Sequence, residues 1–461
     1  MDAVLLSRLQ FAFTTAFHIL FPTLTIGLGL FLVIVEFLWL TRKEVIYYRL
    51  YRFWVKIFAI HFAVGVVTGV VLEFEFGTNF ARFSQKVGNV FAPLMAYEGM
   101  TAFFLEAGFL GIMLFGWNRV KPIVHFMATC FVSAGAVFSA FWIMAANAWM
   151  QTPAGYEIVN GKFHVTSFYE AIFNPAFPTH LAHMVLASFE TTAFVVAGIS
   201  ALFILKKRHE PFYRKSLALG LIMAAVCAPL QVVVGDFRGQ NVFKYQPAKL
   251  AAMEGHWETN TGGGAAFVLF GIPDMKAEKN HYEITVPAAL SLLLTHSLTG
   301  KVTGLKSFPV DERPNAFITY WSFRVMVGIG FLFVFIMGWA AWLWRKGRLY
   351  DTPLFLKVLV LLQPLGFIAV ITGWITAEVG RQPWVVYGLM RTIEGVSPIA
   401  AGSVLWSLVT LVLVYAIIGV SYFYYVLKTL YLGPDLAGPV PHVDRAPHRM
   451  DGDLNHRERT A

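Results

Sequence analysis

The stretch Gly402–Leu427, GSVLWSLVTLVLVYAIIGVSYFYYVL, decides the fold class of this chain. It contains no Asp, Glu, Lys, Arg or His, and a run of this length is long enough to cross a bilayer as an α-helix. Strands of membrane barrels instead alternate in polarity over roughly ten residues. The run Phe331–Trp344, together with residues before it, is apolar in the same continuous way. Both runs therefore predict membrane-spanning helices.

The composition of the whole chain agrees with this interpretation. Of its 461 residues, 57% are hydrophobic and 14% are charged, whereas soluble domains carry roughly 25% charged residues. So much apolar surface must face lipid, where only α-helices and closed barrels satisfy their backbone hydrogen bonds. Because the apolar runs are continuous, we predict an all-α, polytopic membrane protein. The composition excludes a water-soluble enzyme.

Nine segments have the length and hydropathy of a transmembrane helix. We place them at 11–40, 53–75, 91–116, 122–150, 180–205, 216–236, 317–344, 354–376 and 402–427.

Two polar segments divide the chain. Residues 237–316 contain Gly-Gly-Gly at 262–264 and scattered charges, which predicts a solvent-exposed loop. Residues 431–461 are rich in Pro, Gly, His and charge, which is typical of a flexible tail. Six helices are therefore expected within 1–236 and three within 317–430.

The placement of Lys and Arg predicts the orientation in the membrane. The net charge is +9, and most of the basic residues in short loops lie on one side of the predicted spans. The other side holds only Arg8, Arg82, Lys86, Lys162, Arg381 and Arg391. Short cytoplasmic loops carry the excess of Lys and Arg. The N-terminus and the long loop should face outward and the C-terminus should face the cytoplasm. The charge is thus a topology signal, and no nucleic-acid partner is expected.

Four potential metal ligands fall within or at the ends of four predicted spans, at a similar depth near the outer side. They are His18, His183, Met326 and Glu378, with Arg324 beside Met326. Ionisable groups inside a membrane are costly and mark functional sites by default. Imidazole and thioether are known axial ligands of haem iron. Each residue also has an ordinary explanation, since a membrane His can hydrogen-bond a neighbouring helix and a Met can simply pack.

Three polar residues on the third and fourth spans suggest a proton path. Glu98 and Glu106 are eight residues apart, roughly 12 Å along a regular helix and about 80° around it. Glu98 is expected near the outer side and Glu106 nearer mid-membrane, and Ser139 lies in the middle of the next span. Carboxylates at stepped depths suit a proton relay. They could equally be structural carboxyls, and serine is common in helix contacts.

The sequence Gly373–Trp384, GWITAEVGRQPW, combines Trp374, Glu378 and Arg381 at the end of the eighth span. An aromatic belt with an ion pair would explain the tryptophans. It would not explain the dense polar run between two glycines.

Six motifs, in order along the chain, resemble subunit I of cytochrome bd-type quinol oxidases. The resemblance covers residues 1 to about 430. The motifs are SRLQFAFTTAFHILF at 7–21, GVVTGVVLEFEFGTN at 65–79, YEGMTAFFLEAGFLG at 97–111, PAKLAAMEGHWET at 247–259, FRVMVG at 323–328 and GWITAEVGRQPW at 373–384.

The resemblance implies three haems. His183 and Met326 match the axial ligands of a low-spin haem b, and Arg324 matches a residue near its propionates. His18 and Glu378 match the ligands of the di-haem site that reduces oxygen. That site would hold a high-spin haem b and a haem d, or a further haem b in place of haem d.

The resemblance also implies roles for the remaining candidates. Trp374 matches a residue between the haems, and Arg381 one close to the di-haem site. The proton-delivery set of the family matches Glu98, Glu106 and Ser139. Two residues tied to quinol oxidation in the outward loop match Lys249 and Glu254. Read without the resemblance, this Lys and Glu could form a solvated loop ion pair. The loop lacks the long insertion of some members and resembles the short-loop branch, which includes the cyanide-insensitive oxidases.

The function implied is quinol oxidation coupled to reduction of O2 to water in the bacterial cytoplasmic membrane. Protons would be taken from the cytoplasm, which generates a proton motive force without a pump. A second, haem-free membrane subunit is the expected partner, and a small single-span subunit is a further candidate. Two alternatives stay open: a haem-b electron-transfer subunit that never meets O2, and an ion-coupled transporter.

Overall fold

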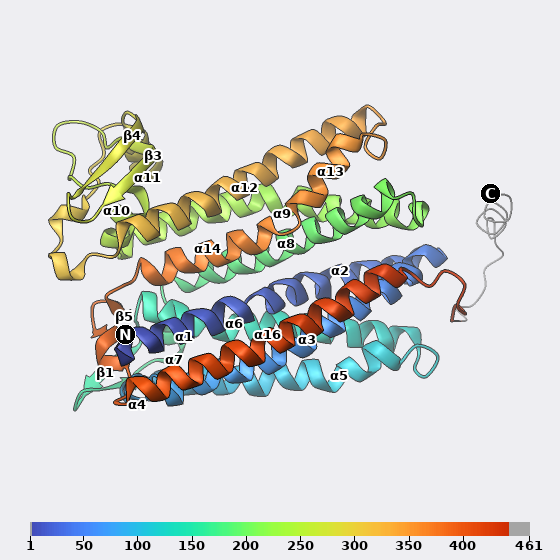
Figure 1. The fold of residues 1–461 in the computed structure, drawn as a ribbon, viewed down its shortest axis with the longest axis horizontal. Helices are drawn as coiled ribbons and strands as arrows, with labels where there is room; N and C mark the ends of the chain where they lie inside the picture. Colours follow the sequence, from blue (N-terminus) through green and yellow to red (C-terminus); the bar gives the residue numbers. More distant parts are fainter. Residues whose placement is uncertain (1, 442–461) are drawn as a thin grey trace.

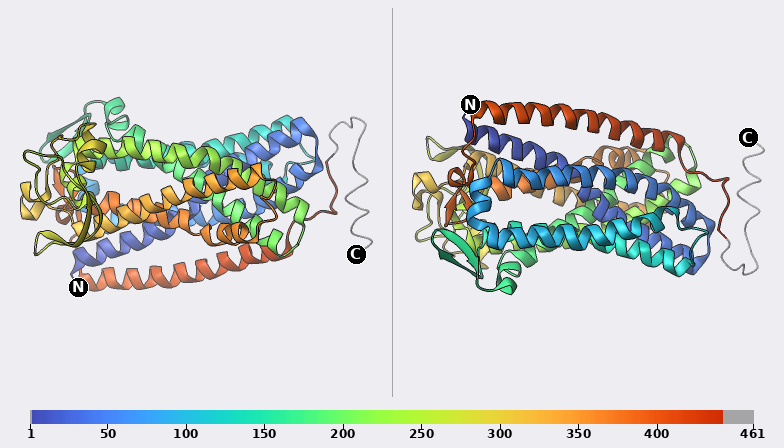
Figure 2. Two further views of the ribbon diagram at one scale, coloured as in Figure 1. Left: turned by 90° about the horizontal axis from the view of Figure 1, so that it is seen from above. Right: turned by 90° about the horizontal axis from the view of Figure 1, so that it is seen from below.

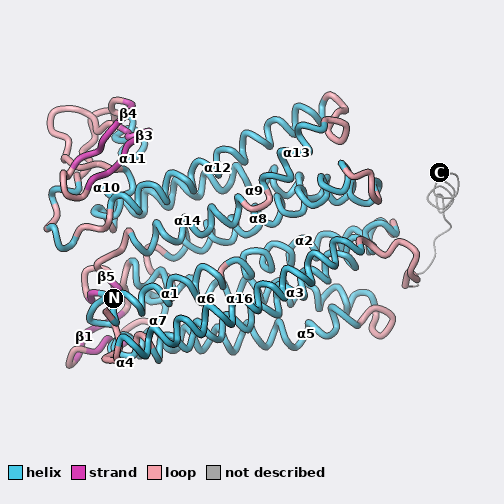
Figure 3. Tube along the Cα trace, viewed as in Figure 1, coloured by secondary structure: helices cyan, strands magenta, loops and turns pink. Residues whose placement is uncertain are grey.

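The computed structural model describes residues 2–441, and they form a bundle of long helices (Figure 1). The N-terminus and residues 246–315 lie at the same end of the bundle, which we call the loop face. The described residues end, at residue 441, at the opposite end of the bundle, which we call the opposite face. Figure 3 shows that the short strands of the described chain also gather at the loop face.

Within residues 2–441, nine helical passes are long and apolar enough to cross a membrane, which confirms the predicted fold class. The passes are α1 (Ala3–His18) with α2 (Leu20–Arg42), α3 (Val45–Thr78), α4 (Ala81–Tyr97) with η1 (Glu98–Ala102) and α5 (Phe103–Phe115), α6 (Pro122–Gln151), α8 (Phe177–Leu205), α9 (Glu210–Tyr245), α12 (Ala316–Arg345), α13 (Pro353–Leu362) with α14 (Leu365–Val379), and α16 (Ala401–Leu432). In both views of Figure 2, α16 runs along one edge of the bundle beside α1.

The third pass differs from the prediction, which began at residue 91. The helix begins at Ala81, because α4 is amphipathic rather than continuously apolar and therefore escapes a search for apolar runs. Its buried face, which includes Phe83 and Phe91, packs against Trp149 near the end of α6. The pass then contains the π-helical turn η1. Such turns add a residue to the helix, so the angle expected between Glu98 and Glu106 for a regular α-helix does not apply.

The long loop is folded, which corrects the prediction of a plain solvent-exposed segment beginning at 237. Helix α9 continues to Tyr245, and α10 (Pro247–Glu254) follows directly. Strands β3 (Phe267–Asp274) and β4 (Lys279–Val286) form an antiparallel hairpin, and α11 (Ala289–Thr295) comes next. Leu250 of α10 packs with Leu290 of α11 in a small apolar cluster. This cluster holds α10 against the bundle, so that the side chains of α10 are buried.

The remaining short elements cap the loop face or close the loop. They are β1 (Tyr156–Val159), β2 (Lys162–Val165), α7 (Phe168–Ile172), η2 (Leu305–Ser307), η3 (Val310–Glu312), β5 (Trp384–Val386), β6 (Met390–Arg391) and α15 (Thr392–Gly395).

Small residues allow the central helices to approach closely, as is usual where lipid provides no hydrophobic drive for helix association. A Cβ on Gly27 of α2 would lie 2.0 Å from Oγ1 of Thr192 on α8. A Cβ on Gly198 would lie 2.6 Å from the carbonyl oxygen of Leu359 on α13. Helix α8 is therefore the centre of the bundle, and its position fixes the histidines that it carries.

Helix α16 continues to Leu432, and the segment rich in Pro, Gly and charge follows from Gly433. Arg49 of α3 donates hydrogen bonds to the carbonyl oxygens of Asp435, at 3.0 Å, and Gly438, at 2.7 Å. The first residues of this segment are thus fixed to the opposite face. The rest of the predicted flexible tail, 442–461, lies outside the described residues.

Candidate functional site

One cavity of about 1550 Å³ inside the bundle brings together every residue that the sequence singled out. This volume exceeds the roughly 300–1,000 Å³ typical of a pocket for one small ligand. Its lining includes His18, Glu98, Glu106, Ser139, His183, Lys249, Glu254, Arg324, Met326, Trp374, Glu378 and Arg381. Shared depth in the sequence therefore corresponds to a shared location in the structure.

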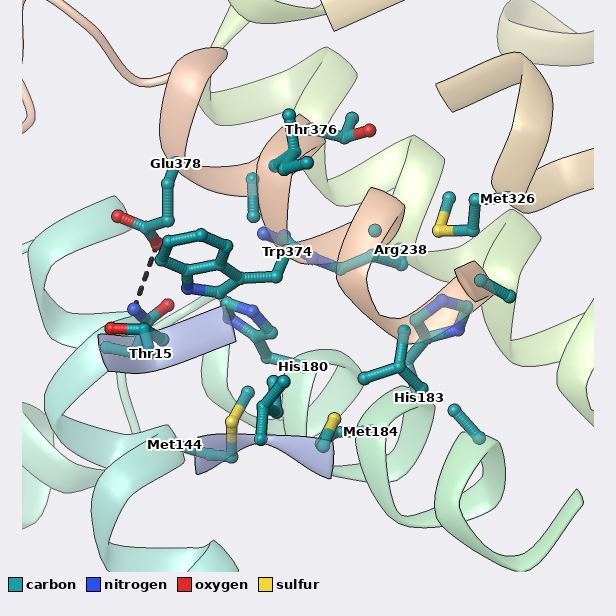
Figure 4. A pocket seen from close by; sticks show the side chains of 18 of the residues that line it. Thr15, Met144, His180, His183, Met184, Arg238, Met326, Trp374, Thr376 and Glu378 are labelled. Carbon is teal, nitrogen blue, oxygen red and sulfur yellow. Dashed lines mark hydrogen bonds between the residues drawn. The ribbon is translucent and has the colours of Figure 1, made fainter. Parts of the chain in front are cut away.

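His183 and Met326 lie at one end of the part of the cavity drawn in Figure 4, where both side chains point into the same space. The buried Nδ1 atom of His183 has no hydrogen-bond partner in the described chain. Two glycines leave room for these side chains. A Cβ on Gly235 of α9 would lie 3.5 Å from Cε1 of His183, and one on Gly373 of α14 would lie 2.7 Å from Sδ of Met326. Imidazole and thioether facing one space form an axial ligand set for haem iron.

Arg324 and Glu254 connect α12 to the loop. Nη2 of Arg324 donates to Oε2 of Glu254 and to the carbonyl oxygen of Val268, both at 2.8 Å. The guanidinium lies 4.6 Å from the ring centroids of both Phe267 and Tyr320. Its Nε and Nη1 atoms are buried without a partner in the described chain. Each unmet buried donor costs about 1–3 kcal/mol, so the cavity beside Arg324 suits an acidic group.

Glu378 is held by three donors at the other end of the drawn region. Its Oε1 accepts from Nδ2 of Asn147 at 3.0 Å and from Nε2 of Gln151 at 3.3 Å. Its Oε2 accepts from Nη2 of Arg381, and the two side chains form an ion pair. Nε and Nη1 of Arg381 are buried without partners among the described residues. The ion pair predicted by the belt alternative does form, but it lines the cavity rather than the lipid boundary.

Trp374 lies between the two ends of this region. Figure 4 shows its indole between Glu378 on one side and the pair of Met326 and His183 on the other, with His180 beneath the ring. The aromatic ring of Trp374 thus occupies the space that separates the two candidate ligand sets.

His18, at the end of α1, is oriented by α3. Its Nδ1 atom lies 2.9 Å from Oγ1 of Thr68. That hydroxyl donates its own proton to the carbonyl oxygen of Val64 at 2.8 Å, so we assign the Nδ1–H as donor to Thr68. Nε2 of His18 is then an acceptor, as a metal ligand requires. A Cβ on Gly69 would lie only 3.1 Å from Cε1 of the imidazole, so a larger residue would crowd the ring.

Glu98 and Ser139 are in direct contact, as the proton-path prediction requires. Oγ of Ser139 donates to Oε1 of Glu98 at 2.9 Å. The buried Oε2 of Glu98 has no partner in the described chain. Glu106 lies further along the same pass, on α5, and lines the same cavity. Both carboxyls therefore face a common interior rather than lipid.

Lys249 and Glu254 do not pair with each other, which excludes the alternative of a solvated loop ion pair. Lys249 is 1% exposed and Glu254 is 5% exposed. Nζ of Lys249 donates to Oε1 of Gln151 at 2.5 Å and of Gln246 at 2.7 Å. Burial holds the pKa of Lys249 well below its ordinary value, and the positive charges of nearby Arg238 and Arg381 add to this. Lys249 can therefore hold its side-chain amine in the uncharged form.

Several polar residues of the cavity were missed by the sequence reasoning. They are Asn147, His180, Glu190, Gln231 and Arg238, and Gln151 lies directly behind the lining, in contact with Glu378 and Lys249. Glu190 lies within a predicted span, and the rule that selected Glu98 would have selected it too. His180 precedes His183 by three residues, so the two lie on neighbouring faces of α8. The two amides on α6 gave no signal, because an amide near a helix end is ordinary.

Comparison with known proteins identifies relatives of this chain. The family model described as cytochrome bd terminal oxidase subunit I matches residues 6–434. Cytochrome bd ubiquinol oxidase subunit 1 of Bacillus subtilis is 39% identical, with 91% of this chain and 92% of the relative covered. Cytochrome bd-II ubiquinol oxidase subunit 1 of Escherichia coli is 33% identical, with 94% and 97% covered.

A solved structure shares the fold. The bd oxidase of Geobacillus thermodenitrificans superposes with a TM-score of 0.86 at 35% identity, covering 94% of this chain and 99% of that one. The resemblance read from the motifs is therefore confirmed, together with a multi-pass location in the bacterial cytoplasmic membrane. This chain belongs to the cytochrome bd terminal oxidase subunit I family, a family of haem-containing oxidoreductase subunits.

Proposed function

We propose that this chain is the haem-carrying subunit of a respiratory oxidase that oxidises membrane quinol and reduces O2 to water. The observation that carries the proposal is the single cavity, which joins two candidate haem ligand sets to a buried Lys and Glu beneath the loop. A transporter would have no use for the ligand sets. An electron-transfer subunit would use only one of them.

The residues of the cavity fit haem. We assign His183 and Met326 to a low-spin haem b, and His18 and Glu378 to the two high-spin haems, which are haem b and either haem d or a further haem b. When bound, the haems supply one-electron transfer and the binding of O2. The thioether, the imidazoles and the carboxylate are all ligands that iron accepts.

Two arginines fit the acidic edges of haem. Arg324 and Arg381 each have two buried guanidinium nitrogens without a partner in the described chain. Haem propionates would satisfy these donors through charge-assisted hydrogen bonds. Arg324 would act beside the low-spin haem, and Arg381 beside the haem that Glu378 holds.

Quinol oxidation is assigned to Lys249 and Glu254 of α10. A buried amine with a lowered pKa can accept a proton from a quinol hydroxyl. Glu254 is ion-paired to Arg324, so the quinol side and the low-spin haem side are joined through one contact. We expect the proton of quinol to leave at the loop face.

Delivery of the protons that O2 reduction consumes is assigned to Glu98, Glu106 and Ser139. Reduction of O2 to water takes four electrons and four protons. With the loop face outward, quinol protons leave outside and consumed protons enter from the cytoplasm. This separates charge across the membrane without a pump.

A second membrane subunit is the proposed partner, since the relatives are named as subunit 1. A small single-span accessory subunit is also proposed. Large apolar side chains that are exposed on α16, such as Trp406 and Val420, must face lipid or such subunits.

A reduced-minus-oxidised spectrum of the purified complex, with and without CO, tests this function against its rivals. We expect haem bands and a CO-induced change. A chain without haem would be a transporter, and haem that does not respond to CO would indicate an electron-transfer subunit.

Lys249→Ala should lower the quinol oxidation rate more than about tenfold, a threshold below the roughly 10²–10⁴-fold contribution usual for a positioned acid–base group. The chemically reduced enzyme should still react with O2, because the haem ligands are untouched. Turnover with quinol and rapid mixing with O2 measure the two activities. Lys244→Ala, at an exposed lysine of α9, is the matched control. If both activities fall together, the quinol site is misplaced.

Gly373→Ala should disturb the low-spin haem without changing any ligand. Its new Cβ would lie 2.7 Å from Sδ of Met326, so the thioether must move. The low-spin absorption band, read in the assembled complex, should weaken or shift. Gly338→Ala on α12 is the control, because its Cβ would meet nothing within 4 Å. An unchanged band in Gly373→Ala would show that Met326 has room to relax.

A further inference from the structure

Gln151, the last residue of α6, is fully buried and contacts both halves of the proposed site. Its Oε1 accepts from Nζ of Lys249 at 2.5 Å and from Nε2 of Gln246 at 3.0 Å. Its Nε2 donates to Oε1 of Glu378 at 3.3 Å. One side-chain amide therefore links the lysine of α10 to the carboxylate of α14.

The orientation of this amide is fixed by its neighbours. The oxygen faces two donors, and the nitrogen faces a carboxylate oxygen. Rotating the amide by 180° would place its N–H groups against the N–H of Gln246 and its oxygen against the oxygen of Glu378. Both contacts would be repulsive in a buried setting. A change of Gln151 itself therefore acts on both ends, because the amide has one favourable orientation.

The two ends differ in how much they depend on Gln151. In the described chain, both acceptors of Lys249 Nζ are amide oxygens, from Gln151 and Gln246. Glu378 keeps two other donors, Asn147 and Arg381, when Gln151 is lost. Loss of the Gln151 amide should leave the Lys249 amine with a single acceptor, so its position should be held much less firmly. The Glu378 carboxylate should shift but stay bonded to Asn147 and Arg381.

We propose that Gln151 is a positioning residue that couples the quinol-oxidising Lys249 to the haem ligand Glu378. The proposal rests on the function proposed above. Gln151 touches neither quinol nor haem in its assigned role. It sets the place of the amine at one end and of the carboxylate at the other, so that both sites depend on the same amide.

Three variants of the assembled complex test this coupling. In each, the quinol KM and kcat, the CO difference spectrum and the low-spin haem band are measured. Gln151→Met removes both contacts. Its quinol KM should rise roughly tenfold, which is near the upper end for the loss of one hydrogen bond between uncharged groups. Its CO difference band should shift, while the low-spin band should stay unchanged.

Two further variants separate the ends. Gln246→Met removes a Lys249 acceptor that does not contact Glu378, so the KM should rise and the CO band should stay in place. Gln151→Glu keeps an acceptor for Lys249 but places a carboxylate against Glu378. Its KM should remain near that of the natural protein, and its CO band should shift.

The coupling is refuted if Gln151→Met moves only one of the two readouts, or if Gln151→Glu leaves the CO band unchanged. The CO band of Gln151→Glu tests the coupling even if the Gln151→Met complex does not assemble. Failure of the proposed function would look different, because the natural protein itself would then lack a CO response or quinol oxidation.

Discussion

Glu106→Gln is expected to lower steady-state O2 consumption more than about tenfold while haem content stays close to normal. Glutamine keeps the size and hydrogen-bonding capacity of the side chain but cannot carry a proton. Glu106 lines the cavity on α5, beyond the π-helical turn that begins at Glu98. Under the proposed function, a carboxyl at that place would receive protons from the cytoplasmic side and pass them toward Glu98 and Ser139.

Two companions sharpen this experiment. Glu106→Asp should retain part of the activity, because aspartate still ionises. Glu36→Gln is the matched control, since Glu36 is a buried carboxyl outside the cavity, bonded to His125 and Thr129 at 2.6 Å each. Oxygen electrode rates per haem give the answer. If Glu106 is purely structural, Glu106→Gln should leave the rate of O2 consumption nearly unchanged. Glu106→Ala should then lower both the haem content and the amount of assembled protein.

Met326→Leu should leave an assembled complex in which the low-spin haem is altered in spin state or lost. The substitution nearly preserves apolar volume, so its packing cost should stay below about 1.5 kcal/mol. It removes the sulfur that faces the same space as His183. Optical and electron paramagnetic resonance spectra of the oxidised complex measure the spin state.

Met337→Leu is the control for this variant, on the same helix but among the residues that pack against the main apolar core. It should leave every haem signal unchanged. Normal low-spin signals in Met326→Leu would rule out Met326 as a ligand.

The sequence predicted the fold because the bilayer imposes a length on every helix that crosses it. Within residues 2–441, each of the nine predicted spans lies in a helical pass, although the third pass begins about ten residues earlier than predicted. The predictions were wrong for segments whose length and composition the bilayer does not constrain. Helix α4 is amphipathic, and residues 246–315 fold through a hairpin and a small apolar cluster. Their structure depends on contacts with the bundle, which no local pattern encodes.

The site was predicted unevenly for a related reason. Candidate ligands such as His183 and Glu378 stand out because ionisable groups are rare in spans. Their convergence on one cavity required the packing of α8 against α9 and α14. The amides Asn147 and Gln151 could not be selected from the sequence, because only their contacts in the folded bundle, such as those with Glu378, distinguish them from other amides.

The large cavity also ties the lifetime of this subunit to the supply of its cofactor. Without haem, the bundle would keep a void of about 1550 Å³ and several unmet guanidinium donors in its interior. A ligand that binds only the folded state stabilises it by mass action. Newly made subunit in a haem-starved cell should therefore open readily and be degraded by membrane proteases, so haem synthesis would set how much of the oxidase accumulates.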